Sequence, residues 1–141
     1  MNRKIILLVF LSLVASVAGA QMKWNQRYQT YINQYRDLAI QQMLRYRIPA
    51  SITLAQGLLE SGAGYSELAT KGNNHFGIKC HGWTGRKAYH DDDERQECFR
   101  AYNNVYESYE DHSLLLTGQP RYRSLFSLGK NDYKAWAHGL K

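Results

Sequence analysis

The chain has 141 residues, with 18 basic and 12 acidic side chains and a formal net charge of +6. Its length allows one domain around one hydrophobic core and is too short for two domains of usual size. The basic residues form no cluster along the sequence, so a nucleic acid is not expected as a partner.

The first twenty residues have the pattern of a secretory signal peptide. Arg3 and Lys4 precede an apolar run at positions 5–17, and Ala-Gly-Ala at positions 18–20 suits a cleavage site. The run is shorter than the roughly 18 apolar residues that a membrane-spanning helix needs. We therefore expect export to the periplasm, the cell envelope or the exterior, with no stable membrane insertion after cleavage. Removal of residues 1–20 takes away two basic side chains and no acid, so residues 21–141 have a net charge of +4. This charge suits an anionic polymer such as a cell wall.

The mature part is expected to begin with helices. Apolar residues recur every three or four positions between 26 and 47, which predicts an amphipathic helix. Pro49 ends this helix or begins the next, which starts there or at Ser51 and is expected to stop at Gly62. A short helix is expected at 66–71.

The pattern then changes, because residues 73–102 contain turn formers and aromatic residues without a helical period. We expect a loop followed by a small antiparallel β element, with turns near 82–85 and 91–94. In an exported protein the pair Cys80 and Cys98 is more often bridged than free, and a bridge would clamp the two ends of this element. Five histidines keep a metal site open as the alternative, but the sequence has no HExxH or CxxC motif. We expect neither a metal nor a cofactor.

The remainder of the chain is expected to be helical. Residues 104–117 place Val105, Tyr109, His112 and Leu116 on one helical face. A short helix at 122–128, with Gly129 as its cap, and a last helix capped by Asn131 or Asp132 follow. The predicted fold is therefore α+β and mostly α, with a helical lobe, a small inserted β-hairpin lobe and a cleft between them. The eleven tyrosines suit either core packing or a cleft lined with aromatic faces for sugar rings.

One acidic residue is unusual in its setting, which is the stretch LAQGLLESGAGYSE at positions 54–67. Glu60 falls in the last turn of an otherwise apolar helix, at the edge of the stripe that contains Leu54 and Leu58. A carboxylic acid at the edge of a core helix is expected to be partly removed from water, which favours the neutral form that donates a proton. Glycosidic cleavage needs such a donor for the leaving oxygen. The alternative is a surface glutamate at a helix end.

The sequence around Glu60 resembles the bacterial glucosaminidases of glycoside hydrolase family 73, peptidoglycan hydrolases with a lysozyme-like core. Seven pieces occur in the order of the family and cover about ninety residues, so the ordered set is far more specific than any one piece. They are AQGLLESGAGYSELA (55–69), NNHFGIK (73–79), WTG (83–85), CFRAY (98–102), ESYEDHSLLL (107–116), RY (121–122) and DYKAWAHGLK (132–141). The chain looks closest to the exported branch in which cysteines flank the β lobe.

The resemblance implies cleavage of the β-1,4 bond between N-acetylglucosamine and N-acetylmuramic acid, with Glu60 as the general acid. The second acidic residue of the family lies in the β lobe, where this chain has Asp91, Asp92, Asp93 and Glu94. We select Asp92. A second carboxylate could activate water, stabilise an oxocarbenium ion or orient the acetamido group of the substrate, so retaining, inverting and substrate-assisted mechanisms all stay open.

The same resemblance implies four residues that contact substrate. Asn74 and Phe76 match the loop that floors the family's cleft, and Tyr109 and Tyr122 match tyrosines that are candidates for orienting the glycan. Peptidoglycan strands are the expected partner, and we expect a monomer.

Members of the family usually continue past the last matching piece with a turn and a helix that packs against the first helix. Residues 21–141 are therefore expected to form either a fragment of the catalytic domain or a core that lacks one wall. Two other functions stay open. One is a lysozyme-like muramidase or lytic transglycosylase, which would cut at the muramic acid, and the other is a non-catalytic domain that binds cell-wall glycan.

Overall fold

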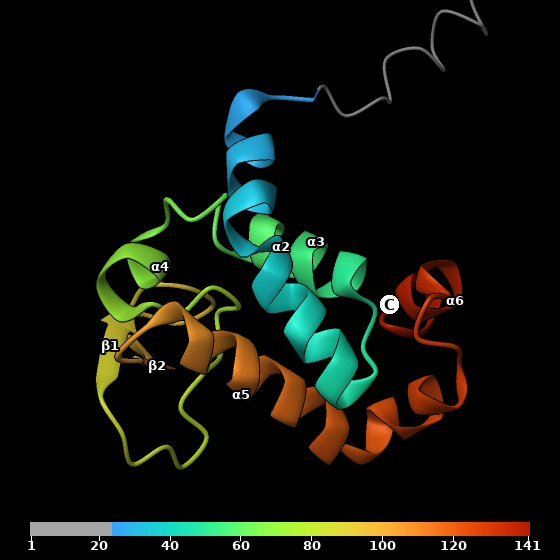
Figure 1. Ribbon diagram of the computed structural model, residues 1–141. Coiled ribbons are helices and arrows are strands. Elements are labelled where there is room, and N and C mark those ends of the chain that lie inside the picture. The colour runs from blue at the N-terminus through green and yellow to red at the C-terminus, as the bar shows by residue number, and fades with distance from the viewer. Residues whose placement is uncertain (1–23) are drawn as a thin grey trace, which may run out of the picture.

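The computed structural model describes residues 24–141, so the predicted signal peptide at 1–20 lies outside the described residues. The described chain is mostly helical, with one small sheet (Figure 1). Its elements are, in order, α2 (Gln26–Tyr46), α3 (Ala50–Glu60), α4 (Glu67–Gly72), β1 (Lys87–His90), β2 (Glu97–Arg100), α5 (Val105–Gly118), the 3₁₀ helix η1 (Pro120–Ser127) and α6 (Tyr133–Gly139). The predicted α+β architecture is confirmed.

The long helix α2 is the centre of the helical lobe and packs against both α3 and α5 (Figure 1). It begins at Asn25, whose side chain accepts a hydrogen bond from the Tyr28 backbone N–H at 3.0 Å, and ends at Arg47 in the left-handed conformation. The following segment contains Pro49, which cannot continue the α2 hydrogen-bond ladder and stands directly before α3.

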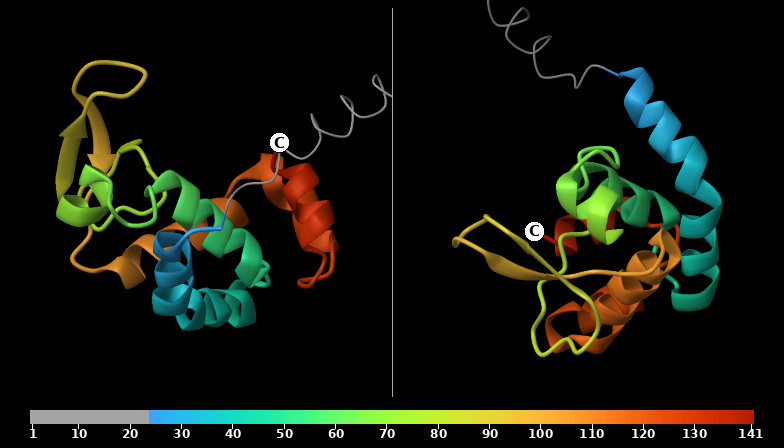
Figure 2. Two further views of the ribbon diagram at one scale, coloured as in Figure 1. Left: turned by 90° about the horizontal axis from the view of Figure 1, so that it is seen from above. Right: turned by 90° about the vertical axis from the view of Figure 1, so that its left-hand side faces the viewer.

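The β lobe is a short hairpin that projects from the helical lobe (Figure 2). Strands β1 and β2 pair antiparallel, with Lys87 opposite Arg100, and an isolated bridge joins Lys79 to Phe99. The predicted disulfide between Cys80 and Cys98 is present and ties the loop before β1 to β2. The turns expected near 82–85 and 91–94 lie before and within this hairpin.

Two predicted boundaries were wrong. The segment predicted as a helix at 122–128 is the 3₁₀ helix η1, which begins at Pro120 because proline suits a first helical position and has no N–H to satisfy. The short helix predicted to end at residue 71 includes Gly72 and is capped by Asn73 in the left-handed conformation. Gly72 lies against Ala101, and its carbonyl accepts a hydrogen bond from the Tyr102 backbone N–H at 2.8 Å, which joins α4 to the chain after β2.

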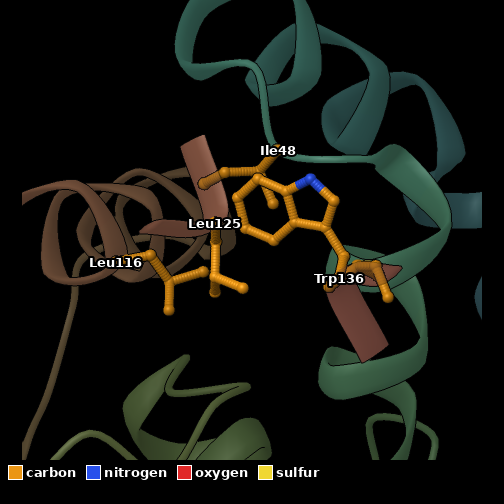
Figure 3. Close-up of a cluster of buried hydrophobic side chains, with 5 residues drawn as sticks. Ile48, Leu116, Leu125 and Trp136 are labelled. Carbon is orange, nitrogen blue, oxygen red and sulfur yellow. The ribbon is translucent and has the colours of Figure 1, made fainter. Parts of the chain in front are cut away.

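The C-terminal elements close the helical lobe around one buried tryptophan. Trp136 of α6 is fully buried and lies beside Ile48, Leu116 and Leu125, which come from three other parts of the chain (Figure 3). Burying such side chains stabilises the fold by about 1.5–3 kcal/mol each. Between residues 24 and 141, no helix combines the length and apolar character needed to cross a membrane.

Candidate functional site

Helix α3 ends at Glu60 because the next residues reverse the chain. Gly62, Ala63 and Gly64 all have positive φ values, of 55°, 57° and 85°. Ser61 is fully buried and holds this turn, since its hydroxyl donates to the Gly57 carbonyl at 2.5 Å and accepts from the Gly64 backbone N–H at 2.8 Å. The turn fixes the place of Glu60 at the open end of the helix.

The Glu60 side chain itself is exposed, and within residues 24–141 no hydrogen bond or ion pair engages its carboxylate. The expected partial burial of Glu60 is therefore wrong. The physical reason is the chain reversal at 62–64, which carries the backbone away from the helix end instead of over it.

A groove of about 270 Å³ meets α3 at Gln56, and Glu60 is not itself among its lining residues. Gln56 lines it, and Gln56 and Glu60 lie on one side of α3 because residues four apart stack one helical turn from each other. The rest of the lining comes from the loop before β1, from α5, from Gln119 and from η1. These residues are Phe76, Gly77, Ile78, Lys79, His81, His112, Leu115, Leu116, Gln119, Arg121 and Tyr122.

A second, larger groove of about 390 Å³ lies between α2 and α3 and is almost entirely apolar. Trp24, Ile32, Leu54 and Leu58 are among its lining residues. Sugar rings present hydroxyl and acetamido groups all around their edge, and their recognition needs hydrogen-bond partners that this groove scarcely offers. The groove beside Gln56 is the better candidate site for a glycan.

Phe76 and Tyr122, two of the four predicted substrate contacts, line the candidate groove. Asn74 is 1 % exposed, so direct contact with substrate is not supported for it. Its amide nitrogen donates to the carbonyls of Ile78 at 3.0 Å and Arg100 at 2.8 Å, and its oxygen accepts from the backbone N–H of Ile78 at 3.1 Å. Asn74 thus attaches the loop to β2 and thereby positions Phe76.

Tyr109 is likewise fully buried and does not reach the groove surface. Its hydroxyl lies 2.9 Å from that of Tyr31, which is 2.8 Å from Nδ1 of His75. Burial raises the pKa of Tyr31 to about 12 and lowers the pKa of His75 to about 4, so both are neutral near pH 7. The three residues join α2, α5 and the loop in one polar network under α3, which is a supporting role for the site.

The Tyr31 and Tyr109 hydroxyls fit under α3 only because residue 57 is glycine. A Cβ at Gly57 would stand 2.6 Å from the Tyr31 hydroxyl and 3.1 Å from that of Tyr109. We expect Gly57→Ala to lower the free energy of unfolding by about 1–3 kcal/mol through overpacking, although alanine is the better helix former by about 1 kcal/mol. Urea unfolding followed by circular dichroism measures this.

Gly118→Ala is the matched control, because nothing lies within 4 Å of a Cβ there. It should leave stability unchanged or raise it slightly. A Gly57→Ala protein as stable as the wild type would show that the two hydroxyls can move without cost.

The predicted second acid, Asp92, lies in the exposed turn of the hairpin and does not line the groove. Its carboxylate is 3.8 Å from Nζ of Lys79, a groove residue, which also lies 3.2 Å from Asp93 and 2.8 Å from Glu97. These carboxylates, Glu97 first, raise the pKa of Lys79 well above its usual value, so the ammonium group is kept. The ammonium contacts all three carboxylates but balances only one of their three negative charges. Asp92 and Asp93 are exposed, and exposed acidic groups are not by themselves evidence of a metal site.

Sequence reasoning missed three residues that the structure brings to the groove or its edge. Gln56 stands one turn before Glu60 in the quoted motif, a spacing that could have identified it. His112 was assigned only to a helical face, yet it lies against Gln56 across the groove floor. Glu97 was not considered; it is the most buried acid of the Lys79 cluster, and no signal in the sequence separated it from the other hairpin acids.

Comparison with known proteins gives a consistent result. Residues 36–141 match the model of the glucosaminidase family, described as mannosyl-glycoprotein endo-beta-N-acetylglucosaminidase. The exo-glucosaminidase LytG of Bacillus subtilis is 34% identical over 110 residues, covering 69% of this chain and 38% of LytG. The peptidoglycan hydrolase FlgJ of Vibrio parahaemolyticus is 27% identical over 124 residues, covering 79% of this chain and 40% of FlgJ. The chain thus spans about two fifths of the length of these relatives.

Solved structures agree. A peptidoglycan hydrolase mutant from Sphingomonas sp. A1 superimposes with a TM-score of 0.65 at 30% identity, covering 79% of each chain. The glycoside hydrolase domain of Salmonella typhimurium FlgJ also gives a TM-score of 0.65, at 24% identity, covering 81% of this chain and 77% of that one, and supports the fold alone.

Proposed function

The chain belongs to the glucosaminidase family, and from this premise we propose that it hydrolyses peptidoglycan at the β-1,4 bond between N-acetylglucosamine and N-acetylmuramic acid. The new reducing end is then N-acetylglucosamine. The observation that carries this proposal is the placement of an exposed carboxylate, Glu60, one helical turn from Gln56, which lines a groove with an aromatic floor.

Glu60 is the proposed general acid. It is exposed without ligand, and a glycan strand seated in the groove would exclude water from the end of α3. Loss of water favours the neutral carboxyl group, which can then protonate the leaving oxygen. The apolar floor around Phe76 supports the flat C–H face of a sugar ring, and Tyr122 at the rim offers a hydroxyl to it.

Asp92 is the proposed second carboxylate. Asp91 is committed to the hairpin turn, because its Oδ1 accepts hydrogen bonds from the Gln96 backbone N–H at 2.7 Å and side-chain amide at 3.2 Å. Asp93 pairs more closely with Lys79 than Asp92 does, at 3.2 Å against 3.8 Å. Asp92 is half exposed and Asp93 more so, and the choice of Asp92 rests on its looser contact with Lys79, which leaves its carboxylate less committed to an ion pair.

We further propose that residues 1–20 direct export and that the catalytic domain acts as a monomer in the cell envelope or outside the cell. A peptidoglycan substrate requires such a location, and the mature part carries the mild positive charge that suits an anionic wall.

The test is a product analysis. Purified protein is incubated with peptidoglycan, the soluble products are reduced with borohydride, and their reducing ends are identified by mass spectrometry. Reduced N-acetylglucosamine ends are expected. Reduced muramic acid or anhydromuramic acid ends would instead indicate a muramidase or lytic transglycosylase, and glycan binding without any product would indicate a non-catalytic domain. Asp92→Asn and Asp93→Asn in parallel distinguish the two hairpin acids.

A further inference from the structure

His112 occupies an unusual position for a histidine, in the floor of the candidate groove. It is 6 % exposed and its ring stacks on that of Phe76, with ring centroids 4.0 Å apart and an interplanar angle of 17°. Its Nε2 lies 2.9 Å from Oε1 of Gln56, and Nδ1 is buried without a hydrogen-bond partner in the described part of the chain. Burial lowers the pKa of His112 to about 3, so the ring is neutral and carries one N–H.

The contact with Gln56 decides which ring nitrogen holds this hydrogen. Because the amide oxygen of Gln56 can only accept, Nε2 of His112 donates to it and Nδ1 is left as the bare acceptor. The other end of the Gln56 amide is then turned away from His112. Its two N–H groups are donors with no protein partner among residues 24–141, in a side chain that lines the groove.

The surroundings of these donors match one substituent of an amino sugar. An acetamido group has a carbonyl oxygen that accepts hydrogen bonds and, next to it, an apolar methyl group. The groove places the Gln56 amide beside an apolar floor that includes Phe76, Ile78 and Leu115. A 2-hydroxyl group ends closer to the sugar ring than an acetamido carbonyl, so in its place the Gln56 N–H groups would lose their acceptor and the apolar surface would stay uncovered.

We infer that Gln56 is a specificity-determining residue, whose amide nitrogen donates to the acetamido carbonyl of an N-acetylhexosamine in the groove. His112 is a positioning residue that holds the Gln56 amide in this orientation. This inference rests on the proposed function and deepens it, since it states how the site selects an N-acetylated glycan. Stacking on Phe76 holds the His112 ring in place, and the ring in turn holds the amide oxygen of Gln56 by a hydrogen bond. The amide nitrogen of Gln56 then faces the substrate.

The test is a binding measurement, so that it does not depend on cleavage. Triacetylchitotriose and cellotriose are both uncharged β-1,4-linked trisaccharides and differ at carbon 2, where one has an acetamido group and the other a hydroxyl. Calorimetric titration in a Glu60→Gln background should show tighter binding of triacetylchitotriose. Gln56→Leu should reduce this preference about three- to tenfold, the value of one neutral hydrogen bond. Gln41→Leu, exposed on α2, is the matched control and should leave the preference unchanged.

His112→Phe tests the positioning role. Phenylalanine can keep the stack on Phe76 but has no N–H, so the protein should stay folded while part of the preference for the acetylated sugar is lost. A merely structural role would weaken the binding of both trisaccharides equally. An unchanged preference in Gln56→Leu, or no preference in the Glu60→Gln protein, would overturn the inference. A clear preference without N-acetylglucosamine ends in the product analysis would instead overturn only the proposed function.

Discussion

Glu60→Gln is expected to reduce peptidoglycan cleavage by about 10²–10⁴-fold, because glutamine cannot give a proton to the leaving oxygen. The loss should appear in kcat, with little change in KM, since the amide keeps the size of the side chain and hydrogen-bonding groups at its end. Stability should not change, because the Glu60 side chain is exposed and makes no hydrogen bond or ion pair within residues 24–141. Release of reducing ends and thermal unfolding, measured on the same preparation, test both statements.

A matched control is Glu67→Gln, another exposed glutamate, at the first position of α4. It loses an ion pair with Lys71 on the surface and should keep full activity with little or no change in stability. If Glu60→Gln cleaves peptidoglycan as fast as the wild type, the general acid lies elsewhere, and the buried side chains under α3 offer no replacement that reaches the groove.

The sequence predicted the helices and the hairpin well because their signals are local. The three- and four-residue spacing of α2, the proline before α3 and the cap at Asp132 all act within a few residues of where they stand. The disulfide followed from the number of cysteines, and its two ends lie where the predicted hairpin needed them.

The candidate site was harder to predict because its roles depend on contacts between distant parts of the chain. Asn74 and Tyr109 were matched to substrate contacts, but burial by α3 and β2 makes them supports of the loop and of α5. Gln56 and His112 are 56 positions apart, and only the packing of α5 beside the loop brings them together. A motif can therefore locate a site before it can say which of its residues reach the solvent.

Mild acid is expected to destabilise the fold, because two histidines are buried in the neutral state. His75 is 2 % exposed and His112 6 %. Burial lowers their pKa values from 6.5 to about 4 and about 3. Between these values and 6.5 the unfolded chain binds protons that the folded chain does not, so stability falls as the pH decreases. The stabilisation is complete above pH 6.5 and is lost as the pH falls through the folded pKa values.

The size of the effect follows from the two shifts. Within this window each histidine lowers the free energy of unfolding by about 1.4 kcal/mol for every pH unit of acidification. The free energy of unfolding should therefore drop by about 4 kcal/mol between pH 7 and pH 5. That is a large part of the 5–15 kcal/mol that usually separates folded from unfolded domains. Carboxylates have ordinary pKa values of about 4, so this window belongs mainly to the histidines.

Urea unfolding of the wild type at pH 7, 6 and 5 measures the slope directly. In His75→Asn the slope of the free energy of unfolding against pH should be about half that of the wild type, even if the variant is less stable. His138→Gln changes an exposed side chain of α6 and should leave this slope unchanged. A free energy of unfolding that stays constant from pH 7 to pH 5 would mean that His75 and His112 take up protons in the folded protein over the same pH range as in the unfolded chain. His112 would then donate from both ring nitrogens below about pH 6.5, and the neutral ring with a single N–H toward Gln56 would be restricted to neutral and higher pH.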